Sequence, residues 1–232
     1  MKGQRDGVIV ASNQTQEWLL KWWWKHYSKE NAYPVTFFDL GMSKSAQLWC
    51  LSKGALLSFS FPKGSIAPIE EIEQSKKKLW EAKYPGDLWE GRKEWFAKPF
   101  LLLKSPYKRT IWMDLDCEVR KPIAPLFAYA DTLDQFSIMQ LKIEELEVYN
   151  TGVIVCDKHS PIPKKWAEHT LQNNQNHFGD ETLLMEAVEK EGLKINPHPM
   201  IYNWPTILPQ NEESVIRHHI GGNAKMRILE TL

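Results

Sequence analysis

The chain has 232 residues, and its 29 lysines and arginines balance its 29 aspartates and glutamates. A chain of zero net charge has no overall field to attract nucleic acid or an anionic membrane, so we expect no nucleic acid as a partner. This length predicts one domain over residues 1–232, and because no apolar run reaches about 18 residues, we predict no transmembrane segment.

The cysteines and the N-terminus indicate the compartment. Cys50, Cys117 and Cys156 are far apart in apolar surroundings, which favours buried, reduced thiols over disulfides or a zinc site. Residues 1–7 are polar and lack the apolar region of a signal peptide. We therefore expect a cytoplasmic protein, with peripheral association with a membrane left open.

Strand-like and helix-like segments alternate from the start of the chain. Apolar runs at 7–12, 34–39 and 55–61 predict strands, and helical periodicity at 16–29 and 44–53 predicts the helices between them. This order predicts an α/β fold with a mostly parallel, Rossmann-like central sheet and flanking helices. The segment 16–29 is apolar nearly all round, so we expect it to be buried against the sheet.

Residues 62–92 interrupt this alternation, because prolines and glycines flank one charged helical segment at about 69–83. We predict an excursion over the edge of the sheet. The elements expected after it are a helix at 93–103, a strand ending at Asp114, strands at 136–140 and 151–156, helices at 163–172 and 180–191, and a largely irregular tail.

Asp114 and Asp116 follow the apolar run at 111–113. Residues i and i+2 of a strand face the same side, so both carboxylates should converge at the carboxyl edge of the sheet, where open α/β sheets bind ligands. Two like charges aimed at one point repel unless a cation lies between them. The spacing therefore predicts a divalent metal, with phosphate as its accompanying ligand. The alternative, a solvated acidic turn, fits the apolar context less well.

Further polar residues stand in positions that form a pattern with this pair. They are Lys98, Asn150, Gly152, Asp180, His219, Gly222 and Lys225. Together with the aspartates they resemble the glycosyltransferases of the GT-A fold, most closely family 8, which includes glycogenin and the lipopolysaccharide galactosyltransferases. The resemblance covers most of the chain, from the first strand to Lys225.

The resemblance implies a metal-dependent transfer of a sugar from a nucleotide-diphosphate donor, a UDP-sugar, with retention of anomeric configuration. Asp114 and Asp116 would bind Mn²⁺ (or Mg²⁺) and the donor, and His219 would complete the metal shell. Lys225 would contact the diphosphate, with Gly222 between them in His-x-x-Gly-x-x-Lys; a pattern begun at His218 would find alanine in place of the lysine. An imidazole beside two carboxylates favours Mn²⁺.

The resemblance also implies contacts with the rest of the donor. Lys98 would lie near the donor sugar, Asn150 and Asp180 would contact its hydroxyls, and Ala11 and Asn13 would lie near the nucleotide base. The alternatives are a surface lysine for Lys98 and simple helix capping for Asp180. Residues 62–92 would lie on the acceptor side, and the acceptor, a glycan, a protein or a small polyol, stays open. The candidates for stacking against it are Trp80, Trp89 and Trp95, with core packing as the alternative.

Two departures and three alternatives accompany this resemblance. Met226-Arg227 stands where the family often has Pro-Trp, and Asp180-Glu181 replaces the usual Asp-Gln, which adds a carboxylate near the donor sugar. A non-catalytic relative that binds nucleotide sugars is one alternative. A haloacid dehalogenase-type phosphatase is disfavoured because Glu118 stands where that class has Thr or Val. A nucleotidyltransferase would need a glycine-rich basic loop after the first strand, and residues 13–15 do not form one.

Overall fold

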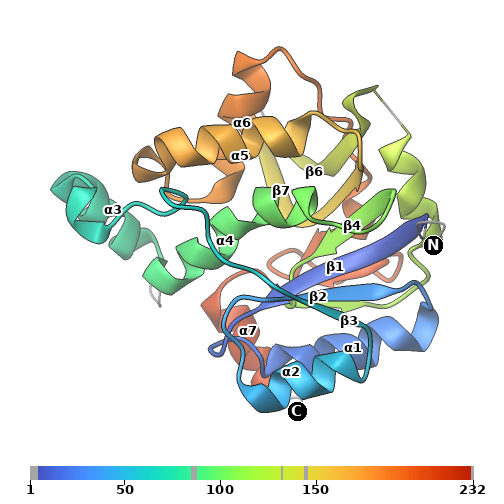
Figure 1. The fold of residues 1–232 in the computed structure, drawn as a ribbon. Helices are drawn as coiled ribbons and strands as arrows, with labels where there is room; N and C mark the ends of the chain where they lie inside the picture. Colours follow the sequence, from blue (N-terminus) through green and yellow to red (C-terminus); the bar gives the residue numbers. More distant parts are fainter. Residues whose placement is uncertain (1–4, 85–87, 132, 144–145, 231–232) are drawn as a thin grey trace.

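The computed structural model describes residues 5–84, 88–131, 133–143 and 146–230. Its centre is a six-stranded sheet in the order β3-β2-β1-β4-β7-β6 (Figure 1). The strands are β1 (Asp6–Ser12), β2 (Val35–Asp39), β3 (Ala55–Ser58), β4 (Arg109–Met113), β6 (Phe136–Ile143) and β7 (Leu146–Asp157). β1, β2, β3 and β4 pair in parallel, whereas β7 pairs antiparallel with β4 and β6. The predicted mostly parallel α/β sheet is confirmed, with an antiparallel hairpin at one edge.

Helices cover both faces of this sheet. In Figure 1, α1 (Leu19–Glu30) and α2 (Lys44–Leu51) lie below it, and α4 (Leu88–Leu103), α5 (Ile162–Asn173) and α6 (Asp180–Lys190) lie above it. Val8, Ile9 and Val10 of β1 are fully buried. Val8 and Val10 face the core between the sheet and α1, whereas Ile9 faces the core between the sheet and helices α4, α5 and α6. Strands covered on both faces are apolar throughout, which is why the first strand was easy to recognise.

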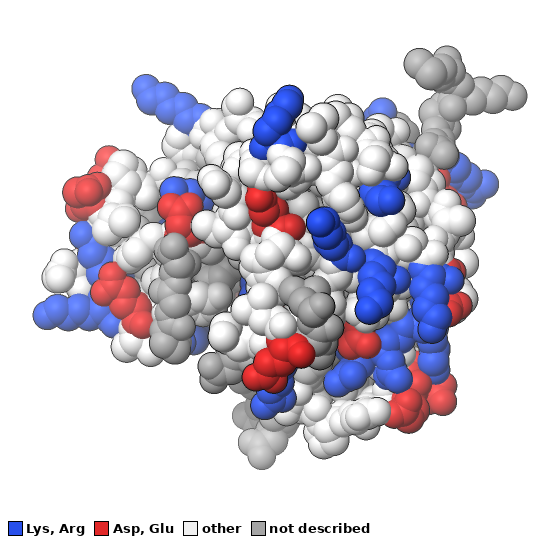
Figure 2. All heavy atoms as spheres, turned by 90° about the horizontal axis from the view of Figure 1, so that it is seen from below, with Lys and Arg blue, Asp and Glu red and all other residues white. Residues whose placement is uncertain are grey.

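The tryptophan-rich helix is buried, as its composition predicts. Trp23 of α1 is fully buried and stacks on Tyr27, with ring centroids 4.8 Å apart. The opposite, outer face of this layer is seen in Figure 2, where side chains of both signs are exposed and lysines and arginines gather on one side. The zero net charge therefore conceals an uneven distribution on this face.

The segment 62–92 contains η1 (Ile69–Glu71), α3 (Gln74–Lys83) and the first turn of α4. α4 begins at Leu88 and not at residue 93, because buried side chains of residues 88–92 hold this turn in place. Arg92 is buried with its guanidinium 4.7 Å from the Trp80 ring centroid, and it donates hydrogen bonds to the backbone oxygens of Asn174 and His177. A charged-looking sequence thus forms a buried helical turn.

The proline-rich tail is more ordered than the sequence predicts. It contains β8 (Trp204–Pro205), β9 (Ile216–His218) and α7 (Gly222–Leu229), and β9 pairs antiparallel with β5 (Cys117–Val119) to form a second, three-stranded sheet. Strands of two or three residues carry too few side chains for a periodicity. This small sheet brings the end of the chain beside the aspartate pair.

Two further expectations concern the cysteines and the membrane. All three cysteines lie within the described ranges, and each is buried and free of a disulfide, as predicted. Among the described residues, no helix combines the length and apolarity needed to cross a membrane.

Candidate active site

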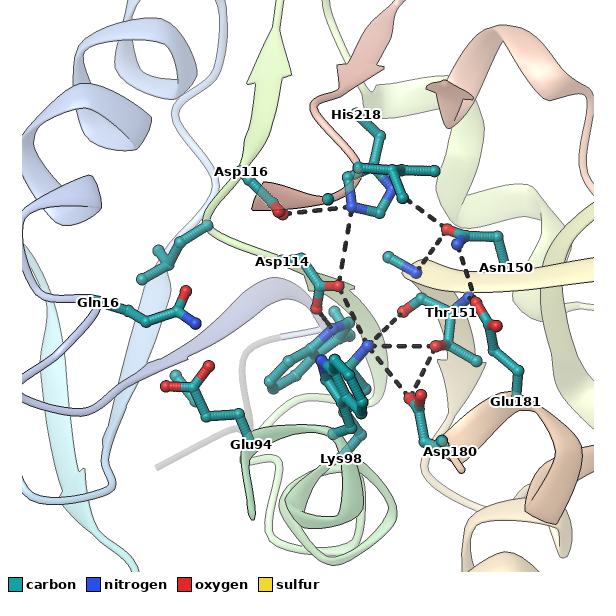
Figure 3. Close-up of a pocket in the computed structure, with 18 of the residues that line it drawn as sticks. Gln16, Glu94, Lys98, Asp114, Asp116, Asn150, Thr151, Asp180, Glu181 and His218 are labelled. Atoms are coloured by element: carbon teal, nitrogen blue, oxygen red, sulfur yellow. Dashed lines mark hydrogen bonds and ion pairs between the residues drawn. The ribbon is translucent and has the colours of Figure 1, made fainter. Parts of the chain in front are cut away.

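A pocket of about 310 Å³ lies at the carboxyl ends of β1 and β4. Figure 3 shows side chains from both halves of the chain pointing into it. The lining includes Ala11, Gln16, Glu94, Trp95, Lys98, Asp114, Asp116, Asn150, Thr151, Gly152, Asp180, Glu181, His218, Gly221 and Lys225. The pocket therefore brings together most of the residues that the sequence singled out.

The two aspartates occupy the turn between β4, which ends at Met113, and β5, which begins at Cys117. Asp114 accepts hydrogen bonds from Lys98 Nζ at 3.1 Å and from Trp112 Nε1 at 2.7 Å. Asp116 lies 3.3 Å from Lys225 Nζ. The carboxylates converge on one side of the turn, as the spacing predicts, and each already has a cation as a partner.

The surroundings of the two carboxylates shift their pKa values in opposite directions. Burial raises the pKa of Asp114; Lys98 opposes this effect and the charge of Asp116 adds to it. Burial alone would also raise the pKa of Asp116, but Lys225 and His218 outweigh it and hold that pKa well below its usual range. Asp116 is therefore the carboxylate that is most firmly ionised, as a metal ligand must be.

The structure places His218, and not His219, beside the aspartates. His218 Nε2 lies 3.2 Å from Asp116 Oδ1 and 3.9 Å from Asp114 Oδ2. His219 is not among the described residues that line the pocket; its Nε2 lies 3.2 Å from Glu118 Oε2 and its ring packs edge-on against Trp22. Successive residues of a strand face opposite sides, so the sequence-based choice of His219 is corrected by one residue.

Two amide oxygens fix the orientation of the His218 ring. Its Nδ1 lies 2.9 Å from Asn203 Oδ1 and 3.2 Å from Asn150 Oδ1. Since both neighbours are acceptors, Nδ1 carries the proton, and the lone pair of a neutral ring points from Nε2 toward the aspartates. Nε2 is linked to the carboxylates either by its own proton, as in an imidazolium–carboxylate pair, or by a metal ion bound to the lone pair of the neutral ring. The donor set of Asp114, Asp116 and His218 therefore fits a divalent metal. Cys117 also lies close to Asp116 and His218, but it stays a thiol because burial raises its pKa.

Gly152 of β7 gives His218 the space to reach the pocket. A Cβ atom at position 152 would lie 2.1 Å from Cε1 and 2.4 Å from Nδ1 of the His218 ring. Any larger residue here would displace the ring, because such distances are far below van der Waals contact. This glycine within β7 thus has a steric role in the site.

Lys98 is a buried member of the pocket, not a surface lysine. Its Nζ lies 3.1 Å from Asp114 Oδ2, 3.2 Å from Asp180 Oδ2 and 3.1 Å from Thr151 Oγ1. Burial alone would lower the pKa of Lys98, but the charges of Asp114 and Asp180 outweigh it and raise that pKa. The ammonium group therefore stays charged and joins the Asp114 carboxylate to the one on α6.

Asp180 is the first residue of α6, and Gly179 occupies the cap position without a side-chain hydrogen bond. The Asp180 carboxylate instead accepts from Thr151 Oγ1 at 2.8 Å, so it faces the pocket and does not simply cap the helix. Its neighbour Glu181 accepts from Asn150 Nδ2 at 2.9 Å. Burial, reinforced by the charge of Asp180, raises the pKa of Glu181 to about 7.

Three remaining sequence candidates have different positions. Ala11 lines the pocket, whereas Asn13 is not among its described lining residues, and Asn13 Oδ1 accepts from the backbone N–H groups of Thr15 and Gln16. Asn13 therefore stabilises the turn after β1. Gly222 begins α7, and its surroundings lie outside the described part of the structure.

Sequence reasoning missed Glu94, which lies one turn before Lys98 on α4 and faces the pocket (Figure 3). Its Oε1 atom is buried and has no hydrogen-bond partner among the described residues. Burial raises the pKa of Glu94 to about 8, against the opposing charge of Lys225. The i, i+4 spacing from Lys98 was the available signal, because residues four apart share one face of a helix.

No protein-family model and no characterised protein sequence matches the chain. Solved structures do match it. The glycosyltransferase GlyE of Streptococcus pneumoniae TIGR4 has a TM-score of 0.63 at 13% identity, covering 94% of this chain and 55% of GlyE. Mouse xyloside xylosyltransferase 1 has a TM-score of 0.59 at 12% identity, covering 95% of this chain and 98% of that protein.

An active-site mutant of LgtC, in which a glutamine is replaced by glutamate, has a TM-score of 0.57 at 12% identity, covering 94% of this chain and 88% of that protein. LgtC has also been solved as a galactosyltransferase with donor and acceptor sugar analogues. The present chain spans about half the length of GlyE. What these proteins share with the chain is the fold of the backbone. The chain has the GT-A glycosyltransferase fold.

Proposed function

We propose that this chain is a glycosyltransferase that uses a divalent metal ion and a nucleotide-diphosphate sugar, with a UDP-sugar as the donor. The observation that carries the proposal is the convergence of Asp114, Asp116 and His218, with Lys225 beside them, at the ligand-binding edge of a GT-A fold. The arrangement is typical of a site for a metal and a diphosphate.

Asp114, Asp116 and His218 would hold the metal ion, and Mn²⁺ suits their mixture of oxygen and nitrogen ligands. When bound, the ion neutralises negative charge that develops on the departing nucleotide diphosphate. Lys225 supplies a second positive charge on the same side, and the negative charge of Asp116 raises its pKa above the ordinary value despite burial. Gly221 lines the pocket with a φ of +88°, which favours glycine and lets backbone approach a phosphate.

The opposite side of the pocket is suited to a sugar. Lys98 donates hydrogen bonds, Asp180 accepts them, and Asn150 and Glu181 lie alongside. Sugar hydroxyls both donate and accept, so a ring of alternating donors and acceptors would orient them. Retention of anomeric configuration belongs to this proposal through the family resemblance, and the anomer of the isolated product tests it.

The acceptor would enter past an aromatic wall. Tyr84, Trp95 and Phe178 line the pocket together, with the Trp95 ring 5.3 Å from Tyr84 and 5.7 Å from Phe178. Trp80 is buried beneath Arg92. Trp80 and Trp89 are not among the described residues that line the pocket, so Trp95 is the tryptophan that we propose to stack against an acceptor glycan.

The test is Mn²⁺-dependent release of nucleotide from a panel of nucleotide sugars. We expect the wild-type chain to hydrolyse at least one donor and Asp116→Ala to lose about 10²-fold or more, because Asp116 contacts both Lys225 and the metal position. Asp131→Ala removes an exposed carboxylate and is the control. Wild-type rates in Asp116→Ala would overturn the proposal. Donor binding without turnover would favour the alternative of a non-catalytic nucleotide-sugar-binding relative, and the fold leaves the phosphatase alternative without support.

A further inference from the structure

A second group of potential metal ligands lies on α5, on α6 and on the segment between them. His169 Nε2 is 2.9 Å from Glu186 Oε2, and His177 Nε2 is 2.7 Å from the same oxygen. One ligand atom from each of the three side chains lies within 4.8 Å of the others. None of the three is among the described residues that line the active-site pocket. The group is therefore separate from the aspartate pair.

The geometry is close to that of a bound ion. Ligand atoms about 2.0–2.1 Å from a tetrahedral zinc ion are separated by roughly 3.3 Å. The two nitrogen–oxygen distances are a few tenths of an ångström shorter. Glu186 is 52% exposed, so its side chain is free to withdraw by that amount, whereas the histidines at 7% and 17% are held in place.

Neighbouring hydrogen bonds orient the His177 ring. The Thr182 hydroxyl lies 3.2 Å from the Gly179 carbonyl oxygen and 3.1 Å from His177 Nδ1. A hydroxyl has one proton, and when Thr182 donates it to Gly179 its oxygen accepts from Nδ1–H of His177. His177 Nε2 then presents a lone pair to the Glu186 carboxylate at 2.7 Å. Two acceptors at this distance are bridged either by a proton or by a metal ion.

The His169 ring faces the same carboxylate from α5. His169 Nδ1 has its own partner, the side-chain amide of Asn173 at 3.1 Å, which fixes the ring with Nε2 toward Glu186. Because a metal-bound histidine donates its far ring N–H to an acceptor, metal binding at Nε2 requires His169 Nδ1–H to face the oxygen of the Asn173 amide, turned over from its orientation in the structure.

We propose that His169, His177 and Glu186 form a second metal site, selective for a zinc-like transition-metal ion, with its remaining coordination position open to solvent. Two imidazoles and one carboxylate favour zinc over Mg²⁺ or Ca²⁺, which prefer all-oxygen shells. The ion would join α5, the segment that leads to α6, and α6 itself. Because α6 begins with Asp180 and Glu181, this site would stabilise the helix that presents those two carboxylates to the pocket.

The experiment measures zinc binding by the chelator-washed full chain, using equilibrium dialysis for stoichiometry and thermal unfolding for stabilisation. Glu186→Gln removes the half-exposed ligand, and Glu189→Gln, an exposed position one turn further along α6, is the matched control. We expect Glu186→Gln to bind one equivalent fewer than Glu189→Gln and to lose the zinc-dependent rise in Tm.

The comparison is repeated in an Asp116→Asn background, so that zinc in the active-site pocket does not enter the count. We expect the Asp116→Asn protein to bind one equivalent of zinc. Replacing that zinc with cobalt(II) should give the absorption spectrum of a tetrahedral site. Adding His177→Ala should abolish the binding. If Asp116→Asn does not fold, the difference between the two glutamate variants in the wild-type background still decides. Equal stoichiometry and equal Tm in those two variants would overturn the proposal and leave a hydrogen-bonded histidine–glutamate cluster only.

Discussion

The Nε2 atom of His218 lies 3.2 Å from Oδ1 of Asp116, although the histidine belongs to β9 and the aspartate to the turn before β5. The pairing of β5 with β9, in which Cys117 lies opposite His218, produces this contact. It determines which of two adjacent histidines serves the site.

The two histidines should differ sharply in their effect on metal binding. We expect His218→Ala to weaken Mn²⁺ binding by about 10²-fold or more, because it removes a ligand that Asn150 and Asn203 orient. His219→Ala should leave Mn²⁺ affinity within about twofold of wild type, since its imidazole contacts Glu118. Calorimetric titration of each variant with Mn²⁺ is the measurement. The reverse order would restore His219 as the ligand.

A side chain at position 152 should act through His218. We expect Gly152→Ala to reduce Mn²⁺ affinity nearly as much as His218→Ala, because the added Cβ would overlap the imidazole ring. In a His218→Ala background the same change should cost little more, since the overlapping ring is gone. Titrations of the two single variants and the double variant form the cycle. Additive losses would show that the glycine acts on something other than the histidine.

Lys98 should be important for folding as well as for the pocket. Lys98→Met removes the cation between Asp114 and Asp180 and leaves two buried carboxylates without it, so we expect a loss of about 3–5 kcal/mol in unfolding free energy. Lys93→Met on the same helix removes a lysine whose side chain is 46% exposed, and it should change stability by about 0.5 kcal/mol at most. Urea unfolding at neutral pH compares the two. Equal stability would contradict the buried position of Lys98.

Glu94 should make stability fall as pH rises. Its ordinary pKa of 4.5 applies to the unfolded chain, and burial raises the folded value to about 8. The folded state therefore binds this proton more tightly than the unfolded state does. The contribution of Glu94 to the free energy of unfolding is fully present below pH 4.5 and is lost progressively as the pH rises to 8. Glu94→Gln should not show this loss and should exceed the wild type by at least ~1 kcal/mol at pH 8.

Unfolding of both proteins by urea at pH values across this window is the measurement, with Glu70→Gln, at an exposed position of η1, as the control. A constant difference between Glu94→Gln and wild type at every pH would mean that the carboxyl is hydrated in solution.

The sequence supports the prediction of the fold and of one half of the site, for a physical reason. β1 and β4 are covered on both faces and are therefore apolar runs that stand out from their surroundings. The residues at their carboxyl ends are fixed once the strands are located. Asp114 and Asp116 were found in this way, whereas Lys98 and Asp180, which lie on helices, were assigned to the site through the family resemblance.

The other half depends on contacts between short segments. Whether His218 or His219 faces the aspartates is decided by the register of β9 on β5, and neither strand is longer than three residues. Asn203 follows a 3-10 turn without any pattern of its own. Glu94 lies within the predicted helix 93–103, but its burial against the pocket comes from tertiary contacts that helical periodicity does not reveal.

The second, three-stranded sheet has a consequence for how the site forms during synthesis. The carboxylates, Lys98 and the α6 acids all precede residue 182, whereas His218 and Lys225 arrive on β9 and α7. A nascent chain that has completed the six-stranded sheet still lacks the imidazole and the phosphate-side ammonium, and its aspartate pair keeps only Lys98 as a counter-charge. Competence for metal and donor would thus be acquired in one late step, when β9 pairs with β5.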